Sequence, residues 1–360
     1  MLLTNEQKEM IRNVVRDVKQ GRQVITCSGY AGTGKTVCIN TLSKAMPNFC
    51  ICAYTGKAAN VLRKKGLSGA STIHSTIYRP YKDFNNETVW QLASAFDIPG
   101  LEGFIVDEAS MIGTEIDRDL QSFGKPIIYV GDHGQLEPIG GTKFNLMAEP
   151  MYKLETVHRN AGEIAHFAEH LRKGLNPRLF PAEKAVQIVK EKVVTAKNLA
   201  DTDQVICAYN KTRVKLNNQV RKEKGIEYTF IAIGEKIMCL RNNRVLQLFN
   251  GMQGTVTKIR KNDRFDFTSD GQEYSQIHYD PDQFGQETNK FEYGSPGNPF
   301  DYAYAITCHK SQGDEWNNVI VYEQKCDKWE HKRWAYTAAS RAKRGLVWIE
   351  SENYIPSYLK

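Results

Sequence analysis

The fold is decided by the stretch Gly29-Tyr30-Ala31-Gly32-Thr33-Gly34-Lys35-Thr36. It follows a β-branched apolar run at residues 24–28 and precedes a helical pattern that continues to about Met46. The string fits G-x-x-x-x-G-K-[ST], a glycine-rich turn between a strand and a helix. Its glycines let successive backbone N–H groups face a phosphate, and the N-terminus of the following helix adds its dipole. The sequence therefore predicts a nucleotide site at residues 29–36.

Two side chains of this stretch carry the expected chemistry. Lys35 is expected to place its cation beside the β- and γ-phosphates of ATP, and the hydroxyl of Thr36 to ligate Mg²⁺. The alternative is a chance glycine-rich turn, but average residue usage makes such a string roughly a one-in-a-hundred event for this length. We therefore expect ATP and Mg²⁺ as the cofactors.

Further polar side chains follow later apolar runs. Residues 104–106 lead to Asp107 and Glu108, and residues 127–130 lead to a loop that contains Gln135. At the end of a strand, Asp107 suits the Mg²⁺ shell and Glu108 suits the base for the attacking water. Gln135 is interpreted as a sensor of the γ-phosphate. An ordinary strand-to-loop transition explains this residue equally well.

The alternation of strands and helices predicts the fold class. Strand-like runs at 24–28, 50–54, 104–106 and 127–130 precede turns and helical patterns, and a second series follows at 205–209, 319–322 and 346–349. Such alternation favours parallel sheets covered by helices. The prediction is an α/β chain with two domains in tandem, a small insertion at 76–100, and a β-rich, SH3- or OB-like insertion at 226–294, where turn signals such as Asn250-Gly251 join short strands.

Composition agrees with an intracellular globular protein. The chain has 360 residues, of which 41% are hydrophobic and 25% charged, with no apolar run long enough to span a bilayer. The N-terminal 20 residues lack a signal-peptide pattern. Eight cysteines without paired C-x-x-C spacing are interpreted as free thiols, and a formal charge of +7 favours polyanionic partners.

The order of the motifs resembles the superfamily 1 DNA helicases, particularly the RecD and Dda type (superfamily 1B) that moves 5′ to 3′. The resembling segments are 29–36, 107–110, 131–136, 154–159, 304–313 and 336–343. The most specific is Tyr304-Ala305-Ile306-Thr307-Cys308-His309-Lys310-Ser311-Gln312-Gly313. The resemblance implies two RecA-like P-loop domains: domain 1A at 1–75 and 101–155, insertion 1B at 76–100, domain 2A at 156–225 and 295–360, and insertion 2B at 226–294.

The resemblance also assigns roles to single residues. Arg159 and Arg341 match the arginines that reach the γ-phosphate in the family, and rigid guanidinium groups suit the charge that develops there. Two surface arginines in salt bridges are the alternative. Gln7 matches a glutamine that contacts the adenine edge, although a plain helix-start residue explains it nearly as well. Glu315 matches an acid used on the ribose.

A third group of residues is expected to contact the DNA strand. Thr55, Lys57 and His74 lie in segments that resemble motifs lining the strand groove in the family, and His309 and Lys310 are expected to make matching contacts from the second domain. Tyr78, Phe96 and Trp316 are aromatic candidates outside those segments. Hydroxyl, amide and lysine groups suit phosphate contacts that are independent of base sequence. The aromatics could stack on bases, although each alone is more often part of a core.

The resulting hypothesis is an ATP-dependent helicase that moves 5′ to 3′ on single-stranded DNA and opens forked duplexes, with residues 76–100 as the pin. The expected protein is an intracellular monomer, in the host cytoplasm if viral, with a single-strand-binding protein or replisome component as a partner in replication, repair or recombination. Four alternatives stay open: a translocase or remodelling ATPase without unwinding, an RNA-directed helicase, a passive single-strand binder, and a small-molecule kinase.

Overall fold

The computed structural model describes residues 3–82, 88–137, 145–157, 162–226, 231–243, 245–288, 297–325 and 329–350. Contacts within the chain divide it into two units, Met1–Glu169 and His170–Lys360. The division falls inside helix α6 (Glu163–Arg172), whereas the sequence placed a boundary after residue 155. None of the helices in these ranges is long and apolar enough to cross a membrane.

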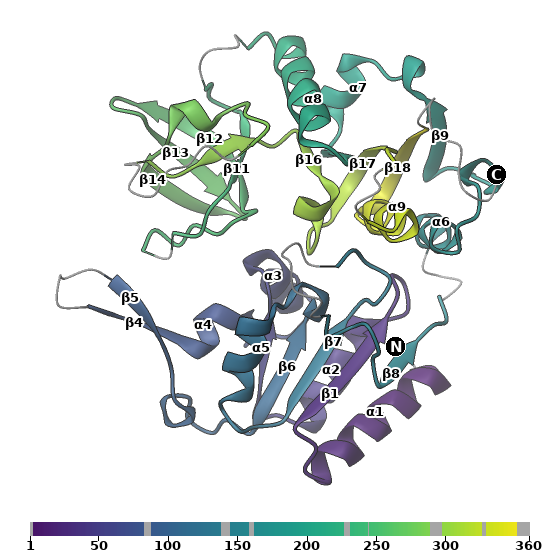
Figure 1. The fold of residues 1–360 in the computed structure, drawn as a ribbon, viewed down its shortest axis with the longest axis vertical. Helices are drawn as coiled ribbons and strands as arrows, with labels where there is room; N and C mark the ends of the chain where they lie inside the picture. The colour runs from purple at the N-terminus through teal and green to yellow at the C-terminus, as the bar shows by residue number, and fades with distance from the viewer. Residues whose placement is uncertain are drawn as a thin grey trace. The chain divides into compact units, whose positions relative to one another are not determined.

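A six-stranded parallel sheet forms the centre of the first unit (Figure 1). In order across the sheet, its strands are β3 (Ser71–Thr72), β2 (Phe49–Ala53), β6 (Gly103–Asp107), β7 (Ile127–Gly131), β1 (Val24–Gly29) and β8 (Tyr152–Leu154). The four predicted strand runs of this half are all present. Because the strands are parallel, the residues that follow β1, β6 and β7 emerge at one edge of the sheet.

Helices cover both faces of this sheet because its strands are apolar on both sides. The helices are α1 (Asn5–Lys19), α2 (Lys35–Ala45), α3 (Gly56–Lys64), α4 (Ile73–Ile77) and α5 (Thr114–Gln121). Ile128 of β7 packs in a cluster with residues of α1, α2 and α3, whereas its neighbours Ile127 and Tyr129 pack with residues of α4 and α5. This alternation along one strand fixes which helix covers which face.

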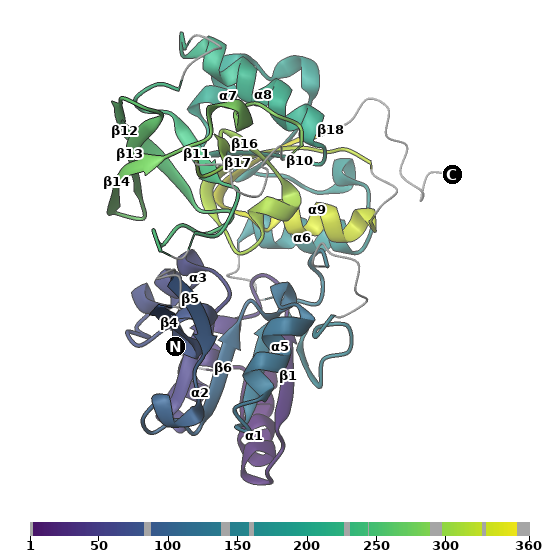
Figure 2. The same ribbon diagram turned by 60° about the vertical axis from the view of Figure 1, so that its left-hand side comes forward.

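The second unit contains a five-stranded parallel sheet. Its order is β16 (Ala305–Thr307), β10 (Gln204–Cys207), β17 (Trp316–Tyr322), β18 (Ala342–Glu350) and β9 (Val186–Lys190). Helices α7 (Ala196–Asp201) and α8 (Asn210–Glu223) lie on one side of it and α9 (His331–Ala339) on the other (Figures 1 and 2). The predicted α/β class with two tandem parallel sheets is confirmed.

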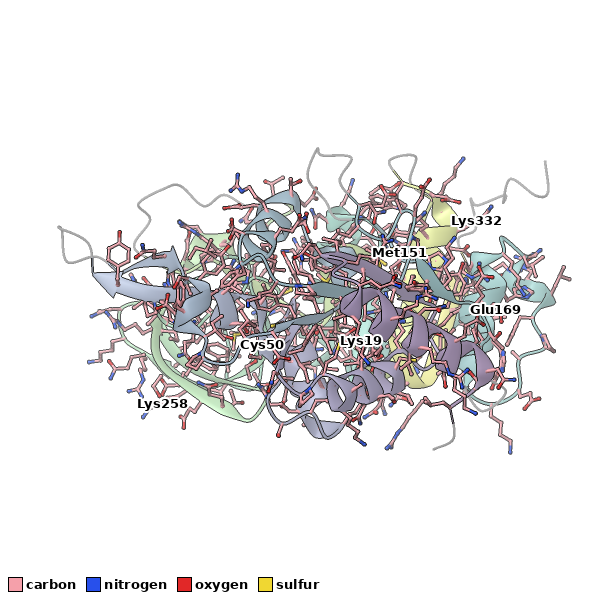
Figure 3. All side chains as sticks on the ribbon, turned by 90° about the horizontal axis from the view of Figure 1, so that it is seen from below. Lys19, Cys50, Met151, Glu169, Lys258 and Lys332 are labelled. Atoms are coloured by element: carbon pink, nitrogen blue, oxygen red, sulfur yellow. The ribbon has the colours of Figure 1, made fainter. Side chains whose placement is uncertain are left out.

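Between α8 and β16 the chain builds a five-stranded antiparallel sheet, which we call the barrel insertion. Its order is β14 (Gln272–His278), β13 (Arg264–Ser269), β12 (Gln253–Arg260), β11 (Lys236–Cys239) and β15 (Phe300–Tyr302). Val256 of β12 is buried, whereas Lys258 of the same strand extends outward (Figure 3). Strand β15 lies beyond the expected end at residue 294, because Phe300 belongs to the aromatic core of this sheet.

Two buried ion pairs fasten the barrel insertion to α8. Arg213 pairs with Asp301, and the Nε of Arg221 lies 2.6 Å from Oε1 of Glu235. Asn217, between them on the same helix face, donates to the carbonyl of Tyr302 at 3.1 Å. The three α8 side chains follow one another at intervals of four residues, so one stripe of the helix holds the insertion.

Within residues 76–100, β4 (Tyr78–Lys82) and β5 (Thr88–Leu92) form a two-stranded antiparallel hairpin (Figure 1). The expected tip of the pin, Asn85-Asn86, lies outside the described residues.

Candidate nucleotide site and nucleic-acid interface

Residues 29–36, the phosphate loop, run from β1 to the N-terminus of α2. The ammonium of Lys35 donates to the carbonyls of Gly29 at 2.6 Å and Tyr30 at 3.2 Å. A Cβ at Gly29 would lie 2.5 Å from Oγ1 of Thr33, and Gly34 has a φ of 86°. Only glycine allows this close turn, so the backbone has the tight glycine-rich turn that the sequence predicts between the strand and the helix.

Residues 132–137, which we call the sensor loop, follow β7 beside the phosphate loop. Asp132 is buried, and its carboxylate lies 3.6 Å from the Lys35 ammonium. The same carboxylate accepts from the Gly134 N–H at 2.9 Å and from the Gln135 amide at 3.4 Å. Asp132 is not among the site residues predicted from the sequence, although its carboxylate contacts both Lys35 and Gln135.

Asp107 and Glu108 stand at the end of β6, next to β7 in the sheet. The Asp107 carboxylate accepts from the Glu108 N–H at 2.9 Å. Glu108 itself has φ 55° and ψ 39°, in the left-handed region. A non-glycine residue in this conformation is uncommon and is concentrated at functional sites. The backbone thus turns sharply where the sequence predicts the metal ligand and the base.

Thr36 and Gln7 both contact polar groups of the first unit. The hydroxyl of Thr36 accepts from Lys65 at 3.4 Å. The buried Gln7 amide donates to the Thr33 carbonyl at 2.9 Å, and its oxygen accepts from the Thr4 N–H at 3.1 Å. Gln7 therefore caps the first turn of α1 and also contacts the phosphate loop, and its contact to the adenine edge stays a prediction.

The structure describes only one of the two arginines that are predicted to reach the γ-phosphate. The guanidinium of Arg341 is buried and donates to the carbonyl of Thr337 at 3.0 Å and that of Asp314 at 3.2 Å. Arg159 lies outside the described residues. Glu315, the predicted ribose contact, is exposed and lies 3.4 Å from the ammonium of Lys343. The roles of Arg341 and Glu315 at a nucleotide stay predictions.

The predicted DNA contacts of the first unit lie on several elements. Thr55 caps α3 by accepting from the Ala58 N–H at 3.1 Å, and Lys57 lies in the same helix. The rings of His74 and Tyr78 stack with centroids 5.5 Å apart, and the Tyr78 hydroxyl donates to Asp119 at 2.5 Å. Tyr78 is thus anchored to α5.

Phe96 has a different environment from these anchored residues. Its side chain is 96% exposed, which leaves its ring available for stacking on a base.

The predicted contacts of the second unit are partly buried. Burial lowers the pKa of His309, whose ring lies edge-on to Trp329 at 4.8 Å. Burial also lowers the pKa of Lys310, which donates to Oδ1 of Asn250 at 2.6 Å. Trp316 packs against the small cluster around Met238. Asn250 belongs to the barrel insertion, so this insertion contacts the most specific motif of the chain.

Two family models match the chain. An AAA domain model matches residues 2–193, and a UvrD-like helicase C-terminal domain model matches residues 302–349. The first match alone covers more than half of the chain. The chain belongs to the AAA-domain family.

Two curated relatives and one solved structure are similar to the chain. The chain is 26% identical to the ATP-dependent RecD2 DNA helicase of Deinococcus radiodurans, over 91% of this chain and 47% of that protein. It is 25% identical to the ATP-dependent DNA helicase dda of Enterobacteria phage T4, over 61% of this chain and 57% of that protein. The chain therefore spans about half the length of these relatives.

The solved structure is the Pif1 helicase from Bacteroides in complex with ADP-AlF3 and single-stranded DNA. It is similar in fold, with a TM-score of 0.60 at 20% identity, and the match covers 99% of this chain and 95% of that one.

Proposed function

We propose that the chain is an ATP-dependent DNA helicase that moves 5′ to 3′ along single-stranded DNA and opens forked duplexes. The observation that carries the proposal is the group formed by Lys35, Asp132 and Gln135, which joins the phosphate loop to the sensor loop. A passive binder has no need for a buried carboxylate that contacts both residues. A small-molecule kinase does not account for the match of residues 302–349 to a helicase C-terminal domain.

The residues of the first unit suit hydrolysis of the γ-phosphate bond. Backbone N–H groups of the phosphate loop and Lys35 would hold the phosphates, and Glu108 would accept a proton from the attacking water, which Gln135 would orient. The Thr36 hydroxyl and the Asp107 carboxylate are oxygen ligands of the kind that Mg²⁺ prefers. When bound, this ion would neutralise charge on the phosphate oxygens.

Arg341 and Arg159 are proposed to supply positive charge to the γ-phosphate, as their matched positions do in the family. The buried hydrogen bonds of Arg341 would have to be exchanged for phosphate contacts during the cycle. This exchange predicts that Arg341→Lys hydrolyses ATP more slowly than the wild type while it keeps nucleotide affinity.

Residues Thr55, Lys57, His74, His309 and Lys310 are proposed to contact the DNA backbone, with Phe96 stacking on a base. The β4–β5 hairpin is proposed as the pin that separates the strands. Deleting the tip expected near Asn85-Asn86 should abolish unwinding and spare DNA-stimulated ATP hydrolysis. Loss of both activities, or of neither, would contradict this assignment.

The deciding experiment is unwinding of two partial duplexes, one with a 5′ single-stranded tail and one with a 3′ tail. Glu108→Gln serves as the inactive control. Opening of the 5′-tailed duplex alone supports the proposal. Opening of the 3′-tailed one alone refutes the polarity, and opening of neither, with ATP hydrolysis retained, favours a translocase or remodelling ATPase.

The proposed setting is inside a cell, where the chain would act as a monomer together with a single-strand-binding protein or a replisome component. Sedimentation on single-stranded DNA would test the stoichiometry. A DNA-bound dimer would contradict it.

A further inference from the structure

A second set of contacts between the phosphate loop and the sensor loop centres on His133. Ser28, the residue before the phosphate loop, is 1% exposed. Its hydroxyl oxygen accepts the backbone N–H of His133 at 3.0 Å and lies 2.5 Å from Nδ1 of the same residue. One buried hydroxyl therefore holds both the backbone and the ring of His133.

The other side of this ring contacts Tyr30, the second residue of the phosphate loop. The two ring centroids are 4.3 Å apart, with the planes inclined by 41°. The carbonyl of Tyr30 accepts from the Lys35 ammonium and from the Thr33 hydroxyl, the latter at 2.8 Å. A displacement of Tyr30 would thus displace an oxygen that holds the catalytic lysine.

The strand register explains why these residues meet. Strands β1 and β7 are parallel neighbours with Ser28 opposite Gly131, so the two loops start side by side. Asp132 then contacts Lys35 by charge, and His133 contacts Ser28 and Tyr30 by a hydrogen bond and ring packing. Two successive residues of the sensor loop are therefore joined to the phosphate loop.

We propose that His133 is a positioning residue that fixes the sensor loop to the phosphate loop, so that Lys35 and Gln135 keep one arrangement around the nucleotide. It acts through Ser28 and Tyr30. The proposal rests on the nucleotide site proposed above and is independent of DNA unwinding.

The test separates the hydrogen bond from the ring contact. Ser28→Ala and His133→Phe remove the hydrogen bond, and His133→Asn keeps a polar group near the Nδ1 position without the ring. Ser43→Ala is the matched control, because the Ser43 hydroxyl donates to the Asn40 carbonyl within α2. For each variant we would measure the affinity for a fluorescent ADP analogue without DNA, kcat and KM for ATP with single-stranded DNA, and the thermal unfolding midpoint.

We expect Ser28→Ala and His133→Phe each to weaken ADP binding or lower kcat by about tenfold, since small misplacements of catalytic groups are costly. The double variant should be no worse than Ser28→Ala alone, because Ser28→Ala already removes the hydrogen bond to the ring that His133→Phe removes. His133→Asn should recover part of the loss, and Ser43→Ala should match the wild type.

Wild-type affinity and kcat in both variants, or losses that simply add, would overturn the proposal. A lower unfolding midpoint with unchanged nucleotide affinity and kcat would also overturn it, because the role would then be structural only. ADP affinity is measured without DNA, so a chain that binds ADP and unwinds nothing would refute the helicase proposal alone.

Discussion

Glu108 combines a predicted catalytic role with a backbone conformation that suits glycine. Its φ of 55° costs a residue with a Cβ about 1 kcal/mol. A glutamate at position 108 would therefore supply the base while it lowers the stability of the folded chain. Such trade-offs are common at active sites.

Replacing Glu108 should separate these two effects. Glu108→Gln and Glu108→Gly should both lower kcat for ATP hydrolysis by about 10²- to 10⁴-fold, because each removes the base. Glu108→Gly should also be more stable than Glu108→Gln, with a free energy of unfolding about 1 kcal/mol higher, since glycine adopts this φ without strain. Urea denaturation of the two variants measures the difference, and equal stabilities would contradict the strain.

His309 provides a pH-dependent prediction. Burial lowers its pKa below the ordinary value of 6.5, so in the window just below pH 6.5 the unfolded chain binds the proton more readily than the folded one. The His309 contribution to the free energy of unfolding should therefore decrease as pH falls through that window and be constant above it. His309→Gln should have a shallower pH dependence there in urea denaturation; identical slopes would argue against this.

The sequence predicted residues whose roles follow from local spacing. The phosphate loop, Asp107 and Glu108 were all predicted from a short string and its neighbouring strand, and the structure places them at the ends of β1 and β6, two strands of one parallel sheet. Asp132 and His133 were missed because their contacts depend on the pairing of β1 with β7, which brings together Ser28 and residues about a hundred positions later. A linear motif likewise could not predict that Arg341 is buried, because burial depends on how distant segments pack.

At the scale of elements, a hydrogen bond joins the η7 turn (Cys308–Ser311) to the barrel insertion. Lys310 was predicted as a DNA contact, yet its ammonium donates to Asn250 in the turn before β12. A lysine that is already oriented loses less side-chain entropy on binding a phosphate. Asn250 would then prepare Lys310 for DNA.

A double-mutant cycle tests this link. Asn250→Ala should weaken single-stranded DNA binding, and in Lys310→Met the same change should have little further effect. We expect a coupling of about 1 kcal/mol, typical of one hydrogen bond. Fluorescence anisotropy with labelled DNA measures it. Additive effects would show that Asn250 does not act through Lys310.

The attachment of the barrel insertion to α8 depends on ion pairs that water does not reach. Arg221 and Glu235 are both completely buried, and the guanidinium also lies 4.0 Å from the centre of the Tyr302 ring. Burial raises the pKa of Glu235, while the Arg221 contacts oppose this rise. Removing one partner would leave the other as an uncompensated buried charge.

Arg221→Met should therefore lower the free energy of unfolding by about 3–5 kcal/mol, whereas Arg221→Met combined with Glu235→Leu should recover much of that loss. Arg178→Met is a suitable control, because its pair with Glu350 leaves the arginine side chain 63% exposed. Chemical denaturation measures all three. A double variant as unstable as Arg221→Met alone would contradict this account of the ion pair between α8 and the barrel insertion.

At the scale of the whole molecule, each unit has hydrophobic clusters of its own. The clusters around β1 and β7 belong to the first unit, and those around β10 and β13 belong to the second. Separate cores allow separate unfolding transitions.

Calorimetry should accordingly resolve two transitions, and ADP with Mg²⁺ should raise the midpoint of the one that belongs to the first unit, because ligand binding stabilises the unit that holds it. Lys35→Ala should abolish this shift. A single transition, or a shift that survives in Lys35→Ala, would contradict the expectation.

The position of the barrel insertion also has a consequence for how the chain reaches its native state. Strand β10 pairs with β16 in the register Val205 to Ala305, and the insertion occupies much of the intervening sequence. Closing such a long loop as an unfolded coil is entropically costly and slow. Early folding of the antiparallel strands would draw the ends of that loop together, so the insertion would speed the completion of the second parallel sheet during synthesis.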